Sequence, residues 1–231
     1  MIYTADDLSY IPRPNAPGSI SGINTSEIMW FISADLGQAN DYTAISLIER
    51  VIRGNGVLGP DQRGERTLNL RHIERVRGIE YPAVVDRLKE LYLSAPLLNQ
   101  TKAVVIDYTG LGRPVYDMMR QAGFYWSLNA ISITGGIDTT SENNHYNVPK
   151  RELVSALQIE LQNNRLKIAR RIKEANNLIE ELSNFQTAIS TSGHDTYNGA
   201  NGVHDDIVMS VAMGVWLACR RHCKWGSGKQ M

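Results

Sequence analysis

Four aspartates occupy positions where a carboxylate has a chemical use rather than a packing use. They are Asp35, Asp107, Asp205 and Asp206. The first two each end an apolar run typical of a buried strand, and the last two immediately precede the longest apolar run of the chain. Because burying an unpaired charge is costly, such carboxylates are expected to face a cation or a phosphate. Hard divalent cations prefer oxygen ligands, and two ions about 3.5–4 Å apart stabilise the attacking and leaving oxygens of a phosphodiester. The pattern therefore predicts a two-metal phosphodiester hydrolase.

Each aspartate also has a structural interpretation. Asp35 and Asp107 both precede glycine-containing turns, where Asp is favoured for its own hydrogen bonds. Asp205 suits a helix N-cap, whose side chain accepts backbone N–H groups. One member of the Asp205–Asp206 pair would then cap the last helix while the other binds metal. Asp41 is interpreted as a hairpin residue rather than a ligand.

The apolar pattern places these residues on a mixed sheet. The expected order is a strand at 28–32 leading to Asp35, strands at 43–53 and 66–77, a helix at 82–94, a strand at 103–107, a helix around Val115–Met119 and a strand at 130–133. Three strands joined without helices form an antiparallel meander, and strands that follow helical crossovers add in parallel. This order predicts an α/β fold with an RNase H-like mixed sheet flanked by helices.

The remainder of the chain is expected to be mainly helical. Residues 135–147 are polar and aperiodic and are expected to form a mobile loop. Helical periodicity begins at Pro149 and recurs at about 172–184, followed by a weak strand at 185–190. The apolar run that follows the last two aspartates predicts a buried helix at 207–222.

Composition limits the class of protein. The chain has 231 residues, 42% hydrophobic and 21% charged, as expected for a soluble globular protein. One domain is expected at 28–224, between a linker or arm at 1–27 and a tail at 225–231. Two cysteines, Cys219 and Cys223, form no disulfide framework and fit a reducing cytoplasm. No apolar run is long enough to span a bilayer, and there is no P-loop motif.

Positive charge is concentrated in one part of a chain whose net charge is zero. Residues 145–173 hold seven Lys or Arg against two acidic residues. Such segregation suits contacts with the phosphates of DNA, although a solvated helix face is the alternative. The candidate DNA contacts are Lys150, Arg151, Lys167 and Arg170, and Lys150 is the candidate for a phosphate contact near the metals.

The motifs together resemble the nuclease domain of the large terminase subunit of tailed bacteriophages. They are Asp35-Leu36-Gly37 with Asp41-Tyr42-Thr43-Ala44-Ile45, Ile106-Asp107-Tyr108-Thr109-Gly110-Leu111-Gly112, Val148-Pro149-Lys150-Arg151-Glu152-Leu153-Val154 with Arg165-Leu166-Lys167-Ile168-Ala169, and His204-Asp205-Asp206-Ile207-Val208. The resemblance spans about residues 28–220. It implies an RNase H-like fold related to RuvC resolvases and cleavage of double-stranded DNA with Mg²⁺ or Mn²⁺ during viral genome packaging. It also implies that Asp35, Asp107 and the Asp205–Asp206 pair bind the metal.

The resemblance implies partners and a location as well. The expected partners are double-stranded DNA, a packaging ATPase domain, the portal and the small terminase subunit, and the expected location is the cytoplasm of the host cell. Family members normally carry the ATPase domain N-terminal to the nuclease, and this chain lacks it. It is therefore either the nuclease half of a longer protein or has its ATPase on another chain.

Three other functions compete with this one. A RuvC-type junction resolvase would differ in the DNA structure that it cuts. An actin-like ATP-dependent kinase shares the Asp-Leu-Gly opening but needs two copies of the fold. A DNA-binding module without catalysis is disfavoured because all the acidic positions are present. A zinc site at Cys219, His222 and Cys223 is rejected because a fourth ligand is lacking and cysteines four residues apart on a helix commonly pack.

Overall fold

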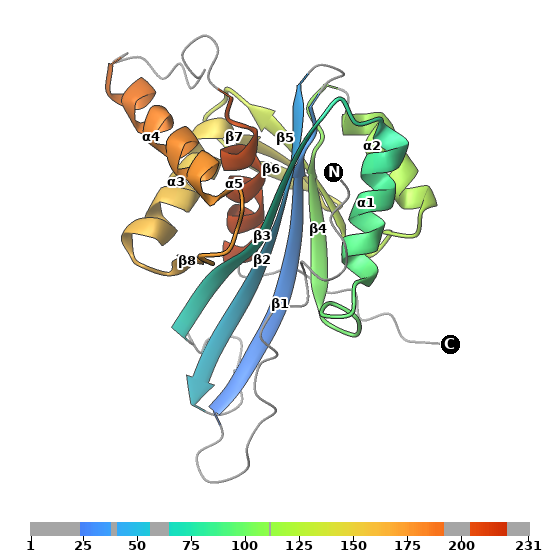
Figure 1. Ribbon diagram of the computed structural model, residues 1–231, viewed down its shortest axis with the longest axis horizontal. Helices are drawn as coiled ribbons and strands as arrows, with labels where there is room; N and C mark the ends of the chain where they lie inside the picture. The colour runs from blue at the N-terminus through green and yellow to red at the C-terminus, as the bar shows by residue number, and fades with distance from the viewer. Residues whose placement is uncertain (1–23, 38–40, 56–64, 111, 192–203, 221–231) are drawn as a thin grey trace.

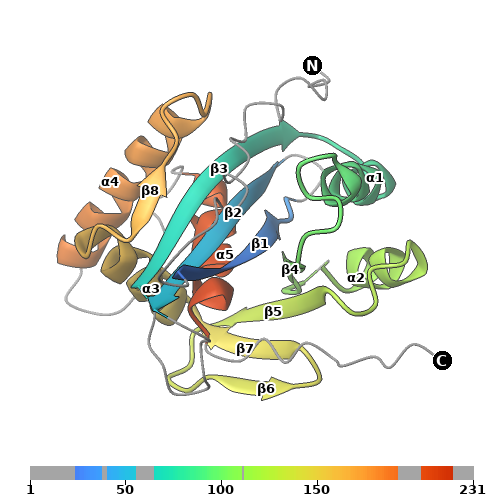
Figure 2. The ribbon, with the colours of Figure 1, turned by 90° about the horizontal axis from the view of Figure 1, so that it is seen from below.

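An eight-stranded sheet runs through the middle of the molecule and separates two layers of helices (Figure 1, Figure 2). The computed structural model describes residues 24–37, 41–55, 65–110, 112–191 and 204–220. The strands are β1 (Asn24–Asp35), β2 (Tyr42–Asn55), β3 (Glu65–Arg77), β4 (Lys102–Asp107), β5 (Leu128–Thr134), β6 (Thr140–Glu142), β7 (His145–Pro149) and β8 (Leu166–Ile168). The helices are α1 (Tyr81–Leu93), α2 (Gly112–Gln121), α3 (Lys150–Gln162), α4 (Ala175–Thr191) and α5 (Asp206–Cys219).

The sheet has the order β6-β7-β5-β4-β1-β2-β3-β8. Strands β1, β2 and β3 form an antiparallel meander. Strand β4 is parallel to β1, β5 to β4, and β7 to β5. The predicted combination of a three-strand meander with parallel strands is therefore confirmed. Since β1, β4, β5 and β7 run in the same direction, their C-terminal ends lie at one edge of the sheet.

Side chains that alternate along β1 build two separate cores. Phe31 lies in the cluster formed with α3, α4 and α5, whereas Trp30 and Ile32 lie in the cluster formed with α1 and α2. Successive strand residues point to opposite faces, so β1 serves both layers. Figure 2 shows α1 and α2 on one side of the sheet and α3, α4 and α5 on the other.

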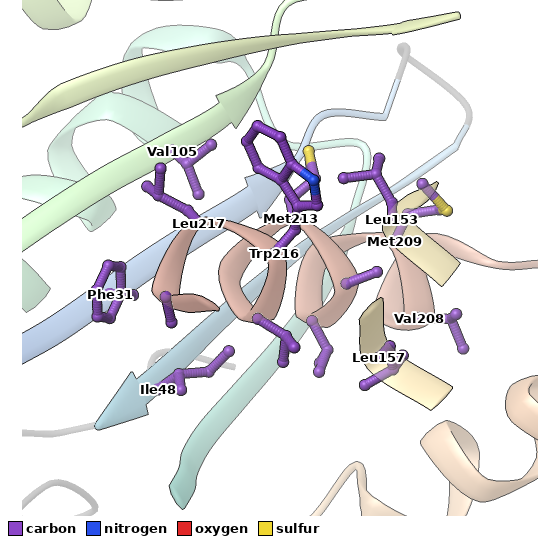
Figure 3. Packing of buried hydrophobic residues seen from close by; sticks show 14 of the residues in the cluster. Phe31, Ile48, Val105, Leu153, Leu157, Val208, Met209, Met213, Trp216 and Leu217 are labelled. Atoms are coloured by element: carbon purple, nitrogen blue, oxygen red, sulfur yellow. The ribbon is translucent and has the colours of Figure 1, made fainter. Parts of the chain in front are cut away.

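Helix α5 is the central element of the larger core. Every residue from Ile207 to Ala218 is buried, which explains why the sequence here is apolar on all sides. Figure 3 shows Met213 and Trp216 of this helix among side chains from the sheet and from α3. The Trp216 indole Nε1 donates a hydrogen bond of 2.7 Å to Glu152 Oε1 of α3, which satisfies its polar end inside the core.

Several predicted boundaries were wrong. The predicted loop 135–147 contains β6 and most of β7, and β8 was not predicted. The weak strand expected at 185–190 is the continuation of α4. Helix α5 ends at Cys219 rather than at residue 222, and β1 begins at Asn24, inside the predicted arm.

The predicted tail at 225–231 and most of the predicted arm lie outside the described residues. In the part of the chain that is described, no helix has both the length and the apolar character needed to cross a membrane.

Candidate active site

Asp35 and Asp107 end two neighbouring parallel strands. The register pairs Ala34 of β1 with Ile106 of β4, so the two aspartates are the next residues along each strand. Asp35 lies an even number of residues after Phe31 on β1, and Asp107 lies an even number after Val105 on β4. Phe31 and Val105 both pack in the core that contains α5. Because side chains alternate across a sheet, both carboxylates belong to the face that α5 covers. The structure thus brings these two predicted residues together.

The turn after each of these aspartates contains a glycine, Gly37 or Gly112, at a position where a Cβ atom would clash with the backbone. A Cβ on Gly37 would lie 2.3 Å from the carbonyl oxygen of Tyr42, and a Cβ on Gly112 would lie 2.1 Å from the carbonyl oxygen of Asp107. The turns therefore fold back tightly on the strand ends. Asp107 also forms a turn bond, because the Thr109 N–H donates to its Oδ1 at 2.7 Å. The turn-forming interpretation of Asp107 is thus correct, and it fixes the carboxylate at the sheet edge.

Helix α5 brings Asp205 and Asp206 to the same edge. It packs against β1 and β2, and the Ser210 hydroxyl donates a hydrogen bond of 3.1 Å to the backbone oxygen of Ser33. Asp205 occupies the N-cap position and Asp206 is the first helical residue. All four predicted aspartates are half-buried, and they come from three elements separated by long stretches of sequence.

Electrostatic interactions link the four carboxylates. Burial raises the pKa of Asp35 well above its usual range, and the negative charges of Asp107, Asp205 and Asp206 raise it further, in that order. Nearby Lys150 opposes this increase. Burial also raises the pKa values of Asp107 and Asp206, against opposing bonds from Thr109 and Arg75 respectively. The cluster therefore carries more negative charge than the neighbouring cations offset.

Two cations hold the helix end of this cluster. Lys150 Nζ lies 2.7 Å from Asp205 Oδ2, and Arg75 Nη2 lies 2.7 Å from Asp206 Oδ2. Among the described residues, no three His, Cys, Asp or Glu side chains are grouped closely enough to hold a metal ion.

The donor set nevertheless fits a hard divalent cation. The four side chains offer only carboxylate oxygens, the ligands that Mg²⁺ and Mn²⁺ favour. Burial is the main cause of the raised pKa of Asp35, and the three neighbouring carboxylates add to it, so part of the increase reflects repulsion among these negative charges. A bound divalent cation would remove that repulsion.

The cap of α5 differs from the prediction. Asp205 occupies the N-cap position, but its side chain makes no capping hydrogen bond and pairs with Lys150 instead. Glu181 of α4 takes that role, because its Oε2 accepts the N–H groups of Ile207 and Val208, each at 3.1 Å. Of the two predicted alternatives, the structure has Asp205 at the N-cap position, but without the capping hydrogen bond that was expected from its carboxylate.

The four candidate DNA contacts lie in two places. Lys150 and Arg151 begin α3 directly after β7, at the edge that carries Asp35 and Asp107. Lys167 is exposed on β8, the last strand at the other side of the sheet, and exposed Arg170 follows it shortly. These four residues therefore do not form a single patch around the carboxylates.

Arg75 and Glu181 are site residues that the sequence analysis missed. Arg75 lies within a correctly predicted strand, and Glu181 lies on a predicted helix, but neither belongs to a motif. Only the packing of α4 and β3 around the start of α5 shows their relation to Asp206, so no sequence signal could have identified them.

A cavity of about 240 Å³ lies away from this site. Its lining includes Glu27, Lys102 and Trp126, from the beginnings of β1 and β4 and the turn before β5. Since the aspartates stand at the C-terminal ends of these strands, the cavity belongs to the opposite edge of the sheet.

Comparison with known proteins identifies the family. The model of the terminase RNase H-like domain matches residues 32–215. Among solved structures, the chain is similar to the large terminase nuclease from thermophilic phage G20c, with 20% identity, a TM-score of 0.50 and 81% of each chain covered. It is also similar to the human cytomegalovirus terminase nuclease domain, which was soaked with Mn, with 10% identity, a TM-score of 0.47, and 85% of this chain and 84% of the other covered.

A search of curated protein sequences finds no match. The family match covers most of the chain and contains Asp35, Asp107, Asp205 and Asp206. The solved phage structure agrees with it in fold. The predicted RNase H-like fold is thereby confirmed, and the chain belongs to the terminase RNase H-like domain family.

Proposed function

We propose that this protein is a metal-dependent endonuclease that cuts double-stranded DNA during the packaging of a viral genome. One observation carries the proposal: Asp35 and Asp107 end adjacent parallel strands beside the helix terminus that carries Asp205 and Asp206. Membership of the terminase RNase H-like family supports a nuclease role for these carboxylates. The raised pKa values of half-buried Asp35 and Asp107 are also the electrostatic setting expected of a functional site.

In the proposed mechanism, Asp35 and Asp107 would hold Mg²⁺ or Mn²⁺ together with the Asp205–Asp206 pair. Two such ions, when bound, stabilise the charge that develops on the attacking and leaving oxygens of the phosphodiester. Asp107 is kept in place by the Thr109 N–H.

Lys150 would contact the DNA phosphate beside the carboxylates. Its ammonium lies 2.7 Å from Asp205 and lowers the pKa values of both Asp35 and Asp107, so it faces the same space. A lysine there can donate a charge-assisted hydrogen bond to a phosphate oxygen. To make this bond, Lys150 would have to leave its ion pair with Asp205.

The biological setting is part of the same proposal. The partners would be double-stranded DNA, a packaging ATPase domain, the portal and the small terminase subunit. The protein would act in the cytoplasm of the host cell. Family membership supports DNA and other terminase components as partners.

Cleavage of a supercoiled plasmid tests the proposal. Wild-type protein should cut with Mg²⁺ or Mn²⁺, should be inactive with EDTA, and should cut poorly with Ca²⁺, whose looser coordination suits in-line attack less well. Asp35→Asn and Asp107→Asn should each reduce the rate by at least about 100-fold, since removal of a ligand costs several kcal/mol of transition-state stabilisation.

The matched control for these variants is Asp117→Asn. Asp117 is an exposed aspartate on α2, so its replacement should leave the rate unchanged. Wild-type rates in folded Asp35→Asn and Asp107→Asn, or full activity in EDTA, would refute the proposal.

A further inference from the structure

Arg75 lies in the same row of the sheet as Asp35. The register pairs Asp35 of β1 with Ala44 of β2, and Ala44 with Arg75 of β3. Neighbouring strands are about 4.8 Å apart, so the backbones of Asp35 and Arg75 are separated by about 10 Å. Ala44 packs in the core that contains α5, so this row faces α5. A long side chain at position 75 can therefore reach the start of α5 across a small alanine.

Arg75 makes this contact with Asp206. Its Nη2 donates a hydrogen bond of 2.7 Å to Asp206 Oδ2, and both side chains are only 14% exposed. The bond uses one carboxylate oxygen. A carboxylate held in this way can offer its other oxygen to a cation, and a hydrogen bond from outside commonly fixes the orientation of a metal-binding carboxylate.

The guanidinium of Arg75 is itself held by two neighbours. Its Cζ lies 4.0 Å from the centre of the Tyr42 ring, a distance typical of a cation–π contact. Its Nη2 lies 3.5 Å from Glu181 Oε1. The side chain thus has support from β2 on one side and from α4 on another, which restricts it to the position that meets Asp206.

Glu181 connects the same network to the backbone of α5. Its side chain is 7% exposed, and Oε2 accepts the N–H groups of Ile207 and Val208. A carboxylate at a helix N-terminus is favoured by the free N–H groups and by the helix dipole. Glu181 therefore fixes the first turn of the helix that carries Asp205 and Asp206.

We infer that Arg75 is a positioning residue that fixes the Asp206 carboxylate beside Asp35, while Glu181 anchors the helix terminus behind it. The inference rests on the proposed function, because Asp206 needs a fixed orientation only if the carboxylates hold a divalent cation. A purely structural role for Arg75, as a counter-ion for buried acids, would affect folding stability and leave metal affinity unchanged.

Two measurements on the same purified proteins separate these roles. The first is the affinity for Mn²⁺ by titration calorimetry, and the second is amide hydrogen exchange at residues 206–209. The variants are Arg75→Gln, which removes the charge, and Arg75→Lys, which keeps the charge but lacks the planar fork. Arg71→Gln is the matched control, since Arg71 also lies on β3 and also pairs with a buried carboxylate, that of Glu49.

The inference predicts a graded result. Arg75→Gln should weaken Mn²⁺ binding about 10- to 100-fold, and exchange at residues 206–209 should become faster. Arg75→Lys should restore part of the affinity. Arg71→Gln should bind Mn²⁺ as the wild type does, even where its melting temperature falls.

The contrary outcomes are distinct. Equal Mn²⁺ affinity in wild type and Arg75→Gln overturns the inference and leaves the proposed function intact, whether or not exchange becomes faster. A weakened affinity in Arg71→Gln equal to that in Arg75→Gln overturns it as well, because the weakening would then follow from general destabilisation. If the wild type itself binds no Mn²⁺, the proposed function fails, and the inference fails with it.

Discussion

Gly214 of α5 lies against Ser33 of β1 so closely that a Cβ on the glycine would stand 2.5 Å from the serine Oγ. The same Cβ would lie 2.8 Å from Ile48 Cδ1, which is fully buried. The Ser33 hydroxyl has little freedom to move away, because it is hydrogen-bonded to Ser46 Oγ at 2.6 Å. This contact sets the distance between the strand that carries Asp35 and the helix that begins at Asp206.

We therefore expect Gly214→Ala to destabilise the protein. Overpacking a core costs about 1–3 kcal/mol, and the better helix propensity of alanine returns up to about 1 kcal/mol. Urea denaturation should show a net decrease of about 1–2 kcal/mol in the free energy of unfolding. Gly135→Ala is the control, since its added methyl group meets no atom within 4 Å. Equal stability of Gly214→Ala and wild type would contradict the close packing of α5 on β1.

Acid should remove a stabilising contribution from Glu74, which is 3% exposed on β3. Burial alone would raise its pKa, but hydrogen bonds from His72 and Arg87 lower it to about 2 from the usual 4.5. A lowered folded-state pKa stabilises the protein above the unfolded pKa, and that effect fades as the pH falls toward the folded pKa. At 1.36 kcal/mol per pKa unit, the lowered pKa of Glu74 stabilises the folded protein by about 3 kcal/mol at neutral pH. This stabilisation should disappear as the pH falls from about 4.5 to about 2.

Urea unfolding of wild type and Glu74→Gln over this pH range measures the effect. The difference in stability should be largest near neutral pH and should shrink as the pH falls. Glu90→Gln is the control, because Glu90 pairs with the same Arg87 but is 64% exposed, and exposed pairs contribute little. A stability difference for Glu74→Gln that is independent of pH would show that the carboxylate is not held in its charged form.

DNA binding should be weak, insensitive to sequence and strongly dependent on salt. No base-reading motif is visible in the sequence, and contacts from Lys and Arg to phosphates carry no sequence information. Replacing Lys150, Arg151, Lys167 and Arg170 together with Ala should weaken binding to all duplexes alike. The slope of log affinity against log salt should become shallower by about 0.9 for each phosphate that the variant no longer neutralises.

Titrations in EDTA with two unrelated duplexes and a four-way junction provide the measurement. Because the four residues lie in two places, the Lys150–Arg151 pair and the Lys167–Arg170 pair should also be replaced separately, which tells which place the DNA occupies. A strong preference for one duplex would contradict the prediction. A strong preference for the junction would favour a resolvase over a packaging nuclease.

The central part of the fold could be predicted because its strands are apolar. The runs that form β1, β2, β4 and β5 are buried and rich in branched residues, and their order with two helices indicated the mixed sheet. Strand β7 was missed because it lies second from one side of the sheet, where His145, Tyr146 and Asn147 are polar or only partly buried. Its place depends on pairing with β5, which is a long-range contact that local composition does not carry.

The site could be predicted in part for a similar reason. Asp35 and Asp107 follow recognisable strands, so their meeting follows from the parallel pairing of β1 with β4. The partners of the last two aspartates could not be foreseen. Asp206 meets Arg75, which is 131 positions away in the chain, and the cap of α5 comes from Glu181 rather than from Asp205. Such contacts are decided by how helices pack on the sheet.

If Asp35 and Asp107 bind the divalent cation with which the protein cuts DNA, Mn²⁺ should bind between these two carboxylates. Anomalous diffraction from crystals soaked in Mn²⁺ tests it most directly. We expect an anomalous peak within about 2.0–2.3 Å of carboxylate oxygens of both aspartates, the bond length usual for such ions, and no peak at this place in Asp35→Asn crystals. Wild-type crystals in which Mn²⁺ is bound elsewhere, with none between Asp35 and Asp107, would contradict it.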